Sequence, residues 1–359
     1  MGSRSIDFGL PGHPALIDSE EPLAWAMTGA STWFVGGLLI DGWAHNNLRT
    51  IDTFFTPWHA VLYSGYLAVA LVVLIGICRN HARGASWRSA VPRGYELTLA
   101  GVILFPVAGF CDMLWHLMFG VESSISALLS PTHLLLATAL SLIVLGPLRV
   151  AAAHGRSVSL AQLVRALIAL TFFLCALLFM AQWNMWTLAG RGADPALLGI
   201  AGQPLSMFRQ ARLGMGLSGI IVRSALITGF MLYALRTFGP RAGMLTFLYA
   251  SSAFLLAVMI RPQPLTVALL TVPAIVAGGF ADLWSRRHAG LAPRSLLALG
   301  FGAPFVYWAL FIAGTAFTRG LWWDVHTAYG ASFLGGISGL LVALLLTTSG
   351  AHETPRSPE

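Results

Sequence analysis

The chain has 359 residues, of which 57% are hydrophobic and only 10% are charged, and its formal net charge is +7. Soluble domains carry about 25% charged residues, so this composition excludes an ordinary soluble protein. The basic residues are all arginines and gather mostly in alternate loops, a pattern that reports membrane topology and does not indicate nucleic-acid binding.

Ten apolar runs follow one another along the chain, and each is long enough to cross a bilayer as a helix. Backbone groups in lipid must be hydrogen-bonded within a helix or a closed barrel, and strand-like alternation is absent from the sequence. We therefore predict an all-α, polytopic integral membrane bundle in contact with the lipid bilayer. Its spans are expected at about 25–44, 57–78, 96–118, 131–148, 160–182, 213–236, 243–260, 264–282, 296–317 and 326–347.

These spans divide the chain into four predicted regions. Residues 1–24 form a polar cytoplasmic tail without a signal-peptide pattern, and 25–150 form a four-helix unit. The C-terminal bundle is expected at 151–347, followed by a disordered cytoplasmic tail at 348–359. A proline-rich tetrapeptide at 261–264 separates the seventh and eighth spans, so they form either a tight helical hairpin or one broken helix.

The arginines predict the orientation of the bundle, because cytoplasmic loops of membrane proteins carry an excess of basic residues. Loops after even-numbered spans are rich in arginine, and loops after odd-numbered spans are poorer. Both termini are therefore expected on the cytoplasmic side of a bacterial inner or plasma membrane. Five histidines then fall at the outer ends of spans: His45, His59, His116, His133 and His326.

Two stretches of the N-terminal half share one spacing, which reads D-x-x-x-H, a short loop, and [T/S]-P-x-H. The repeat predicts a duplicated helical hairpin, and internal repeats of membrane proteins often bracket a functional site. The six aspartates and histidines of the two copies are, in chain order, Asp41, His45, His59, Asp112, His116 and His133.

Helix periodicity places the aspartate and the first histidine of each copy on one helix face, because they are four residues apart. Thr56 suits the N-cap of the next helix and Pro57 its first position, so His59 lies in the first turn. A helix N-terminus disfavours an imidazolium and so favours the neutral form that binds metals. One carboxylate and two imidazoles are expected to converge at each hairpin.

A structural alternative remains open for both copies. Each aspartate could hydrogen-bond its own histidines and tie two helices together without any ion. Two complete copies of the set favour the metal site over this alternative, because polar groups inside membranes are rare and usually functional. Two imidazoles and a carboxylate suit copper, zinc or non-haem iron, so the residue types alone do not name the metal.

The stretch DGWAHNNLRTIDTFFTPWHAVLY, which runs from Asp41 to Tyr63, resembles the C subunit of the copper membrane monooxygenases, the particulate methane and ammonia monooxygenase family. That family carries D-x-x-W-H followed by R-D-T-x-F-T-P-S-H. Its second motif, N-E-W-G-H with a later S-A-P-L-H-W, is similar to the stretch from Asp112 to His133. The resemblance covers about residues 35–145, and Asp112 stands where the family has asparagine.

The resemblance implies copper at both groups, dioxygen chemistry on a small apolar substrate, and other membrane subunits or a periplasmic cupredoxin-like partner. It implies a monooxygenase or one subunit of it. The alternative is a copper- or zinc-binding transporter, chaperone or sensor without oxygenase activity. The apolar character of the first four spans below their outer ends weighs against a transport path.

Other residues near the outer rim are accessory candidates. Asp52 is a candidate partner for a histidine N–H, and Asp324 is a candidate cap for the last span, with His326 in its first turn. Arg223 lies inside the sixth span and is expected to pair within the bundle. Five aromatic residues would line an apolar pocket or form an interfacial belt: Trp43, Phe54, Phe55, Trp58 and Trp115.

Overall fold

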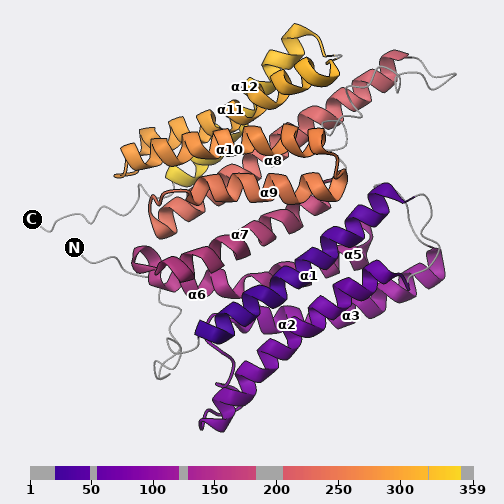
Figure 1. Ribbon diagram of the computed structural model, residues 1–359, viewed down its shortest axis with the longest axis vertical. Helices are drawn as coiled ribbons and strands as arrows, with labels where there is room; N and C mark the ends of the chain where they lie inside the picture. Colours follow the sequence, from indigo (N-terminus) through magenta and orange to yellow (C-terminus); the bar gives the residue numbers. More distant parts are fainter. Residues whose placement is uncertain (1–20, 49–54, 121–127, 183–204, 322, 349–359) are drawn as a thin grey trace, which may run out of the picture.

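The computed structural model describes residues 21–48, 55–120, 128–182, 205–321 and 323–348, and every regular element in these ranges is a helix (Figure 1). The helices are α1 (Glu21–Asn47), α2 (Pro57–Ala82), α3 (Glu96–Phe119), α5 (Pro131–Val144), α6 (Gly146–His154), the 3₁₀ turn η1 (Gly155–Ser157), α7 (Leu160–Met180), α8 (Leu205–Phe238), α9 (Met244–Ile260), α10 (Pro264–Arg287), α11 (Pro293–Arg319) and α12 (Val325–Thr348).

Nine helical segments of this described part are long and apolar enough to cross a membrane, and α9 is a shorter apolar helix. The prediction of an all-α, multi-span membrane bundle is confirmed. The first helix begins at Glu21, earlier than the predicted boundary at residue 25, because Pro22 and the acidic Glu21 both suit a first helical turn. The rest of the two predicted tails lies outside the described residues.

The seventh and eighth predicted spans form a hairpin. The chain leaves the helical conformation at 261–263, and α9 packs against α10. Asp282, near the end of α10, holds the start of α9: its Oδ1 accepts a hydrogen bond from the Leu245 N–H at 3.0 Å, and its Oδ2 accepts from the Thr246 N–H at 3.0 Å and from Thr246 Oγ1 at 2.6 Å. This buried carboxylate caps a helix from a neighbouring element.

Polar contacts identify which helix ends lie together. Asn46, near the end of α1, donates to Gln182 Oε1 at 2.9 Å, and Asn47 donates to the last carbonyl of α9 at 3.3 Å. At the other end of α1, Arg165 of α7 lies 3.3 Å from the Glu21 carboxylate. Helices α1, α7 and α9 therefore run in the same direction, as the alternation of predicted spans requires.

Buried apolar side chains form two clusters. One lies among α1, α2, α3 and α5, and the other lies among α6 to α12. Helix α7 joins them, since it contributes Phe172 and Ala176 to the first cluster and most of its other buried side chains to the second. In Figure 1, α7 accordingly lies between the N-terminal helices and the later ones. The repeated motifs lie on the helices that form the first cluster, in which α1 packs on α2 and α3 packs on α5.

Candidate metal centre

The second helix of each hairpin begins as the local sequence predicts. Thr56 caps α2, and its side chain accepts a hydrogen bond from the His59 N–H at 3.1 Å. Ser130 caps α5 in the same way and accepts from the His133 N–H at 3.3 Å. A proline occupies the first position of both helices. Each cap therefore places a histidine in the first turn, facing the end of the preceding helix.

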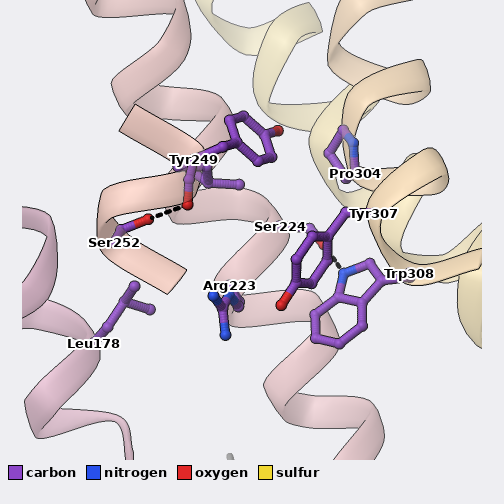
Figure 2. Close-up of a pocket in the computed structure, with 9 residues that line it drawn as sticks. Leu178, Arg223, Ser224, Tyr249, Ser252, Pro304, Tyr307 and Trp308 are labelled. Carbon is purple, nitrogen blue, oxygen red and sulfur yellow. Dashed lines mark hydrogen bonds between the residues drawn. The ribbon is translucent and has the colours of Figure 1, made fainter. Parts of the chain in front are cut away.

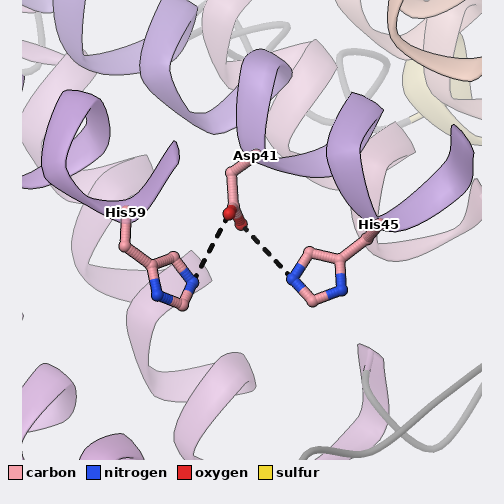
Figure 3. A group of neighbouring side chains, drawn as sticks. All are labelled: Asp41, His45 and His59. Atoms are coloured by element: carbon pink, nitrogen blue, oxygen red, sulfur yellow. Dashed lines mark ion pairs between the residues drawn. The ribbon is translucent and has the colours of Figure 1, made fainter. Parts of the chain in front are cut away.

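Asp41, His45 and His59 form the first group (Figure 3), in which one ligand atom from each residue lies within 4.8 Å of the others. Asp41 Oδ2 lies 3.9 Å from His45 Nε2, and Asp41 Oδ1 lies 3.4 Å from His59 Nε2. The aspartate is buried, whereas 36% of the His45 side chain is exposed. The first group therefore has a buried carboxylate and one imidazole open to its surroundings.

Asp112, His116 and His133 form the second group, whose ligand atoms also lie within 4.8 Å of one another. Asp112 Oδ2 lies 3.4 Å from His116 Nε2, and Asp112 Oδ1 lies 3.7 Å from His133 Nε2. Thr132 Oγ1 donates a hydrogen bond to Asp112 Oδ1 at 2.7 Å, and Ser130 Oγ lies 2.7 Å from His133 Nδ1. The second group is more deeply buried, and hydrogen bonds from α5 orient two of its members.

The carboxylate–imidazole distances are longer than ordinary hydrogen bonds. All four lie between 3.4 and 3.9 Å, beyond the 2.7–3.2 Å of an ordinary N–H···O bond. Ligands about 2.0–2.2 Å from a shared ion stand roughly 3.5 Å apart in tetrahedral geometry. The buried Asp41 Oδ1 has no hydrogen-bond partner among the described residues. The spacing therefore fits atoms that face a common ion.

The ring orientation of His116 is compatible with a metal site. Its Nδ1 lies 3.3 Å from the carbonyl oxygen of Gly120, which can accept a hydrogen bond from it. The other ring nitrogen, Nε2, faces Asp112 Oδ2 at 3.4 Å. A second hydrogen bond that fixes the metal-binding nitrogen is usual in metal sites.

The two groups are close to each other. His116 of the second group is near enough to His45 of the first for the two to interact electrostatically, and Asp41 and Asp112 both interact electrostatically with Tyr63 of α2. Tyr63 stands one turn after His59, and its hydroxyl lies against the backbone of Gly109 in α3, where a Cβ atom would be 2.6 Å away. This tyrosine therefore lies between the two hairpins. The sequence motifs did not identify it.

Glycines allow α1 and α2 to approach at backbone distance beside the first group. A Cβ atom on Gly37 would lie 2.6 Å from the Cα of Leu62, and one on Gly65 would lie 2.5 Å from the Cα of Phe34. Gly37 precedes Asp41 by one helical turn, and Leu62 follows His59 by three residues. The helix contact therefore fixes the separation of the Asp41 and His59 backbones.

The accessory candidates lie apart from the two groups or outside the described residues. Asp324 Oδ1 accepts a hydrogen bond from the Thr327 N–H at 2.7 Å, which lowers the pKa of this exposed carboxyl, so Asp324 does cap α12. His326 is exposed and belongs to neither metal-binding group. Asp52 and Phe54 lie outside the described residues. Of the remaining aromatics, Trp43 packs edge-to-face on Trp58, with ring centroids 5.8 Å apart, Trp115 packs on Phe119, and Phe55 is exposed.

Thr132→Val is expected to lower the metal affinity of the second group by about 10–100-fold, because the variant leaves Asp112 Oδ1 without its 2.7 Å hydrogen bond. The first group should keep its affinity. Isothermal titration calorimetry of the purified protein with a divalent ion measures the affinities of both groups. Thr138→Val is a matched control, since Thr138 of the same helix is exposed and bonds only to the Leu134 carbonyl. Equal affinity in both variants would show that Thr132 does not position the carboxylate.

Comparison of the chain with protein-family models, with curated proteins and with solved structures finds no match. The chain is a multi-span membrane protein with two buried Asp/His/His groups that could bind metal.

Proposed function

We propose that this protein is a membrane metalloprotein that binds copper at its two Asp/His/His groups and acts as a copper-dependent monooxygenase-like protein or subunit. The observation that carries the proposal is the convergence of all six motif residues into two sets whose ligand atoms lie within 4.8 Å of one another. Copper, when bound, would supply the activation of dioxygen. The substrate would be small and apolar.

The donor set supports copper without excluding other ions. Neutral imidazole suits copper, zinc and iron alike, and one carboxylate beside two imidazoles leaves coordination positions open for an exogenous ligand. The likeness of both motifs to the copper membrane monooxygenases favours copper among these three. Asp112, where that family has asparagine, adds a negative charge to the second group and makes it more favourable for a divalent ion.

The chain's own residues have definite roles in this proposal. His45 and His59 would hold the ion of the first group, and Asp41 would complete it or accept a proton from the substrate. His116 and His133 would hold the second ion beside Asp112. Trp43 and Trp58, which pack on each other and are close in sequence to residues of the first group, would exclude water from an apolar substrate. The arginine distribution supports an orientation with both groups at the outer face of the membrane and both termini in the cytoplasm.

An isotope experiment tests this function. The protein, purified in lipid nanodiscs and loaded with copper, would receive a chemical reductant, ¹⁸O₂ and a short alkane. The expected reaction consumes dioxygen, two electrons and two protons, and yields one alcohol carrying ¹⁸O and one water. His59→Ala and His133→Ala should each abolish or strongly reduce the labelled alcohol. A copper-loaded, well-folded protein that incorporates no ¹⁸O, alone or with added subunits, would overturn the oxygenase proposal.

A second candidate function is copper or zinc handling without oxygenase activity, as a chaperone or sensor. The exposure of two ligands favours it: 36% of the His45 side chain and 29% of the His133 side chain are exposed, so an ion could exchange with a partner. Transfer of bound copper to a competing chelator within seconds, together with no isotope incorporation, would support this function over the first.

A further inference from the structure

The chain contains a buried arginine that the metal centre does not use. Among the described residues two arginines are buried, Arg165 and Arg223, with 7% and 8% of their surface exposed. Arg165 lies near the start of α7 and pairs with Glu21. Its guanidinium carbon lies 5.0 Å from the centroid of the Trp25 ring. Arg223 lies 15 residues before Phe238, the last residue of α8, and so well inside the span.

Arg223 has no carboxylate partner within salt-bridge distance in the described part of the chain. Its guanidinium instead lies over the ring of Tyr307, 5.1 Å from the centroid. An uncompensated charge inside a membrane protein is costly, and such residues normally pair with another group or face a functional cavity. The predicted partner of Arg223 within the bundle is therefore not a carboxylate of any described residue.

A small cavity adjoins this arginine, between α7, α8, α9 and α11 (Figure 2), with room for about one water-sized occupant. The polar residues of its lining include the Arg223 guanidinium, which only donates hydrogen bonds, and several hydroxyls, which can donate or accept them. The hydroxyls of Tyr249 and Tyr307 are buried and have no hydrogen-bond partner among the described residues. In Figure 2 the Tyr307 hydroxyl points toward the Arg223 guanidinium, whereas the Tyr249 hydroxyl points away from it. Ser224 in the same lining accepts a hydrogen bond from Trp308 Nε1 at 2.8 Å.

We infer that this cavity binds a single small inorganic anion, such as chloride, held by the Arg223 guanidinium and by the hydroxyl of Tyr307. An anion neutralises the arginine and accepts the proton that the Tyr307 hydroxyl cannot otherwise place. A water molecule would satisfy the hydroxyl but would leave the charge uncompensated. The size of the cavity excludes a phosphate, a carboxylic acid of several carbons or a lipid headgroup.

Chloride binding is measured directly on the full-length protein in lipid nanodiscs. Equilibrium dialysis with ³⁶Cl⁻ is expected to give one bound chloride per chain. Replacement of gluconate by chloride at constant ionic strength should raise the midpoint of thermal unfolding by about 2–4 °C. Arg223→Met should abolish both effects, and Arg236→Met, which removes an exposed arginine of the same helix, should leave both unchanged.

A second variant covers the case in which Arg223→Met does not fold. Tyr307→Phe keeps the charge and the ring packing, and it should lower chloride affinity about tenfold or more. Wild-type protein that binds no ³⁶Cl⁻ and unfolds at the same temperature in chloride and gluconate would overturn the inference. Equal chloride binding in wild type and in Tyr307→Phe would show that the anion binds elsewhere. None of these readouts depends on the metal centre.

Discussion

Replacing both His59 and His133 by alanine is expected to abolish stoichiometric metal binding, whereas each single replacement should remove one of two bound ions. Each histidine supplies an Nε2 atom 3.4–3.7 Å from the carboxylate of its own group, and alanine leaves only one imidazole per site. Loss of one of three protein ligands should lower affinity by more than the 10–100-fold typical of outer-shell changes. Elemental analysis of protein purified in lipid measures the metal content.

His81→Ala is the matched control for this experiment. His81 lies near the far end of α2, stacks on Trp87 and bonds the Ala85 carbonyl, so its removal perturbs the same helix without touching either group. The control should keep two ions per chain. If the double histidine variant retains two ions, or if the well-folded wild type binds none, the two groups are polar ties between helices and the metal proposal fails.

Gly37→Val is expected to weaken metal binding at the first group at least tenfold and to destabilise the fold by about 1–3 kcal/mol. A Cβ atom at this position would lie 2.6 Å from the Cα of Leu62, and ordinary contact begins at 3.4 Å. The obstacle is backbone, so α1 and α2 have to separate by roughly 1 Å. Since Asp41 and His59 stand one turn away on either helix, their ligand atoms would move apart with the helices.

The neighbouring glycine provides the control for the helix contact. A Cβ atom on Gly36 would meet nothing within 4 Å, so Gly36→Val changes the same helix without separating it from α2. Copper titration and thermal unfolding of the two variants separate the effect of the lost helix contact from the effect of adding a valine to α1. The second group should keep its affinity in both. If Gly37→Val binds metal at the first group as tightly as Gly36→Val does, the close helix contact does not set the geometry of the site.

Short-range rules were sufficient to predict the local structure of the site. Apolar run lengths identify the spans, and the Thr-Pro and Ser-Pro pairs identify where α2 and α5 begin. The four-residue spacing of Asp41 and His45 places both on one helix face. These features depend only on neighbours in the chain, so the sequence contains all the information they need.

Features that depend on helix packing could not be predicted in this way. The hydrogen bond from Thr132 to Asp112 joins two helices whose rotation about their axes is set by tertiary contacts. The position of Tyr63 against Gly109 depends likewise on how α2 meets α3. The expectation that Arg223 pairs within the bundle rests on the cost of a lone charge in lipid, but its tyrosine neighbours come from helices distant in sequence.

The closeness of the two groups has a consequence for how they fill. His116 and His45 are near enough to interact electrostatically, so a divalent ion in one group would oppose the entry of a second ion into the other. Uptake should therefore be stepwise and anticooperative, even though both groups offer the same ligand types. When the ion is scarce, most molecules would carry a single one, and the singly loaded protein would be a distinct species with its own reactivity.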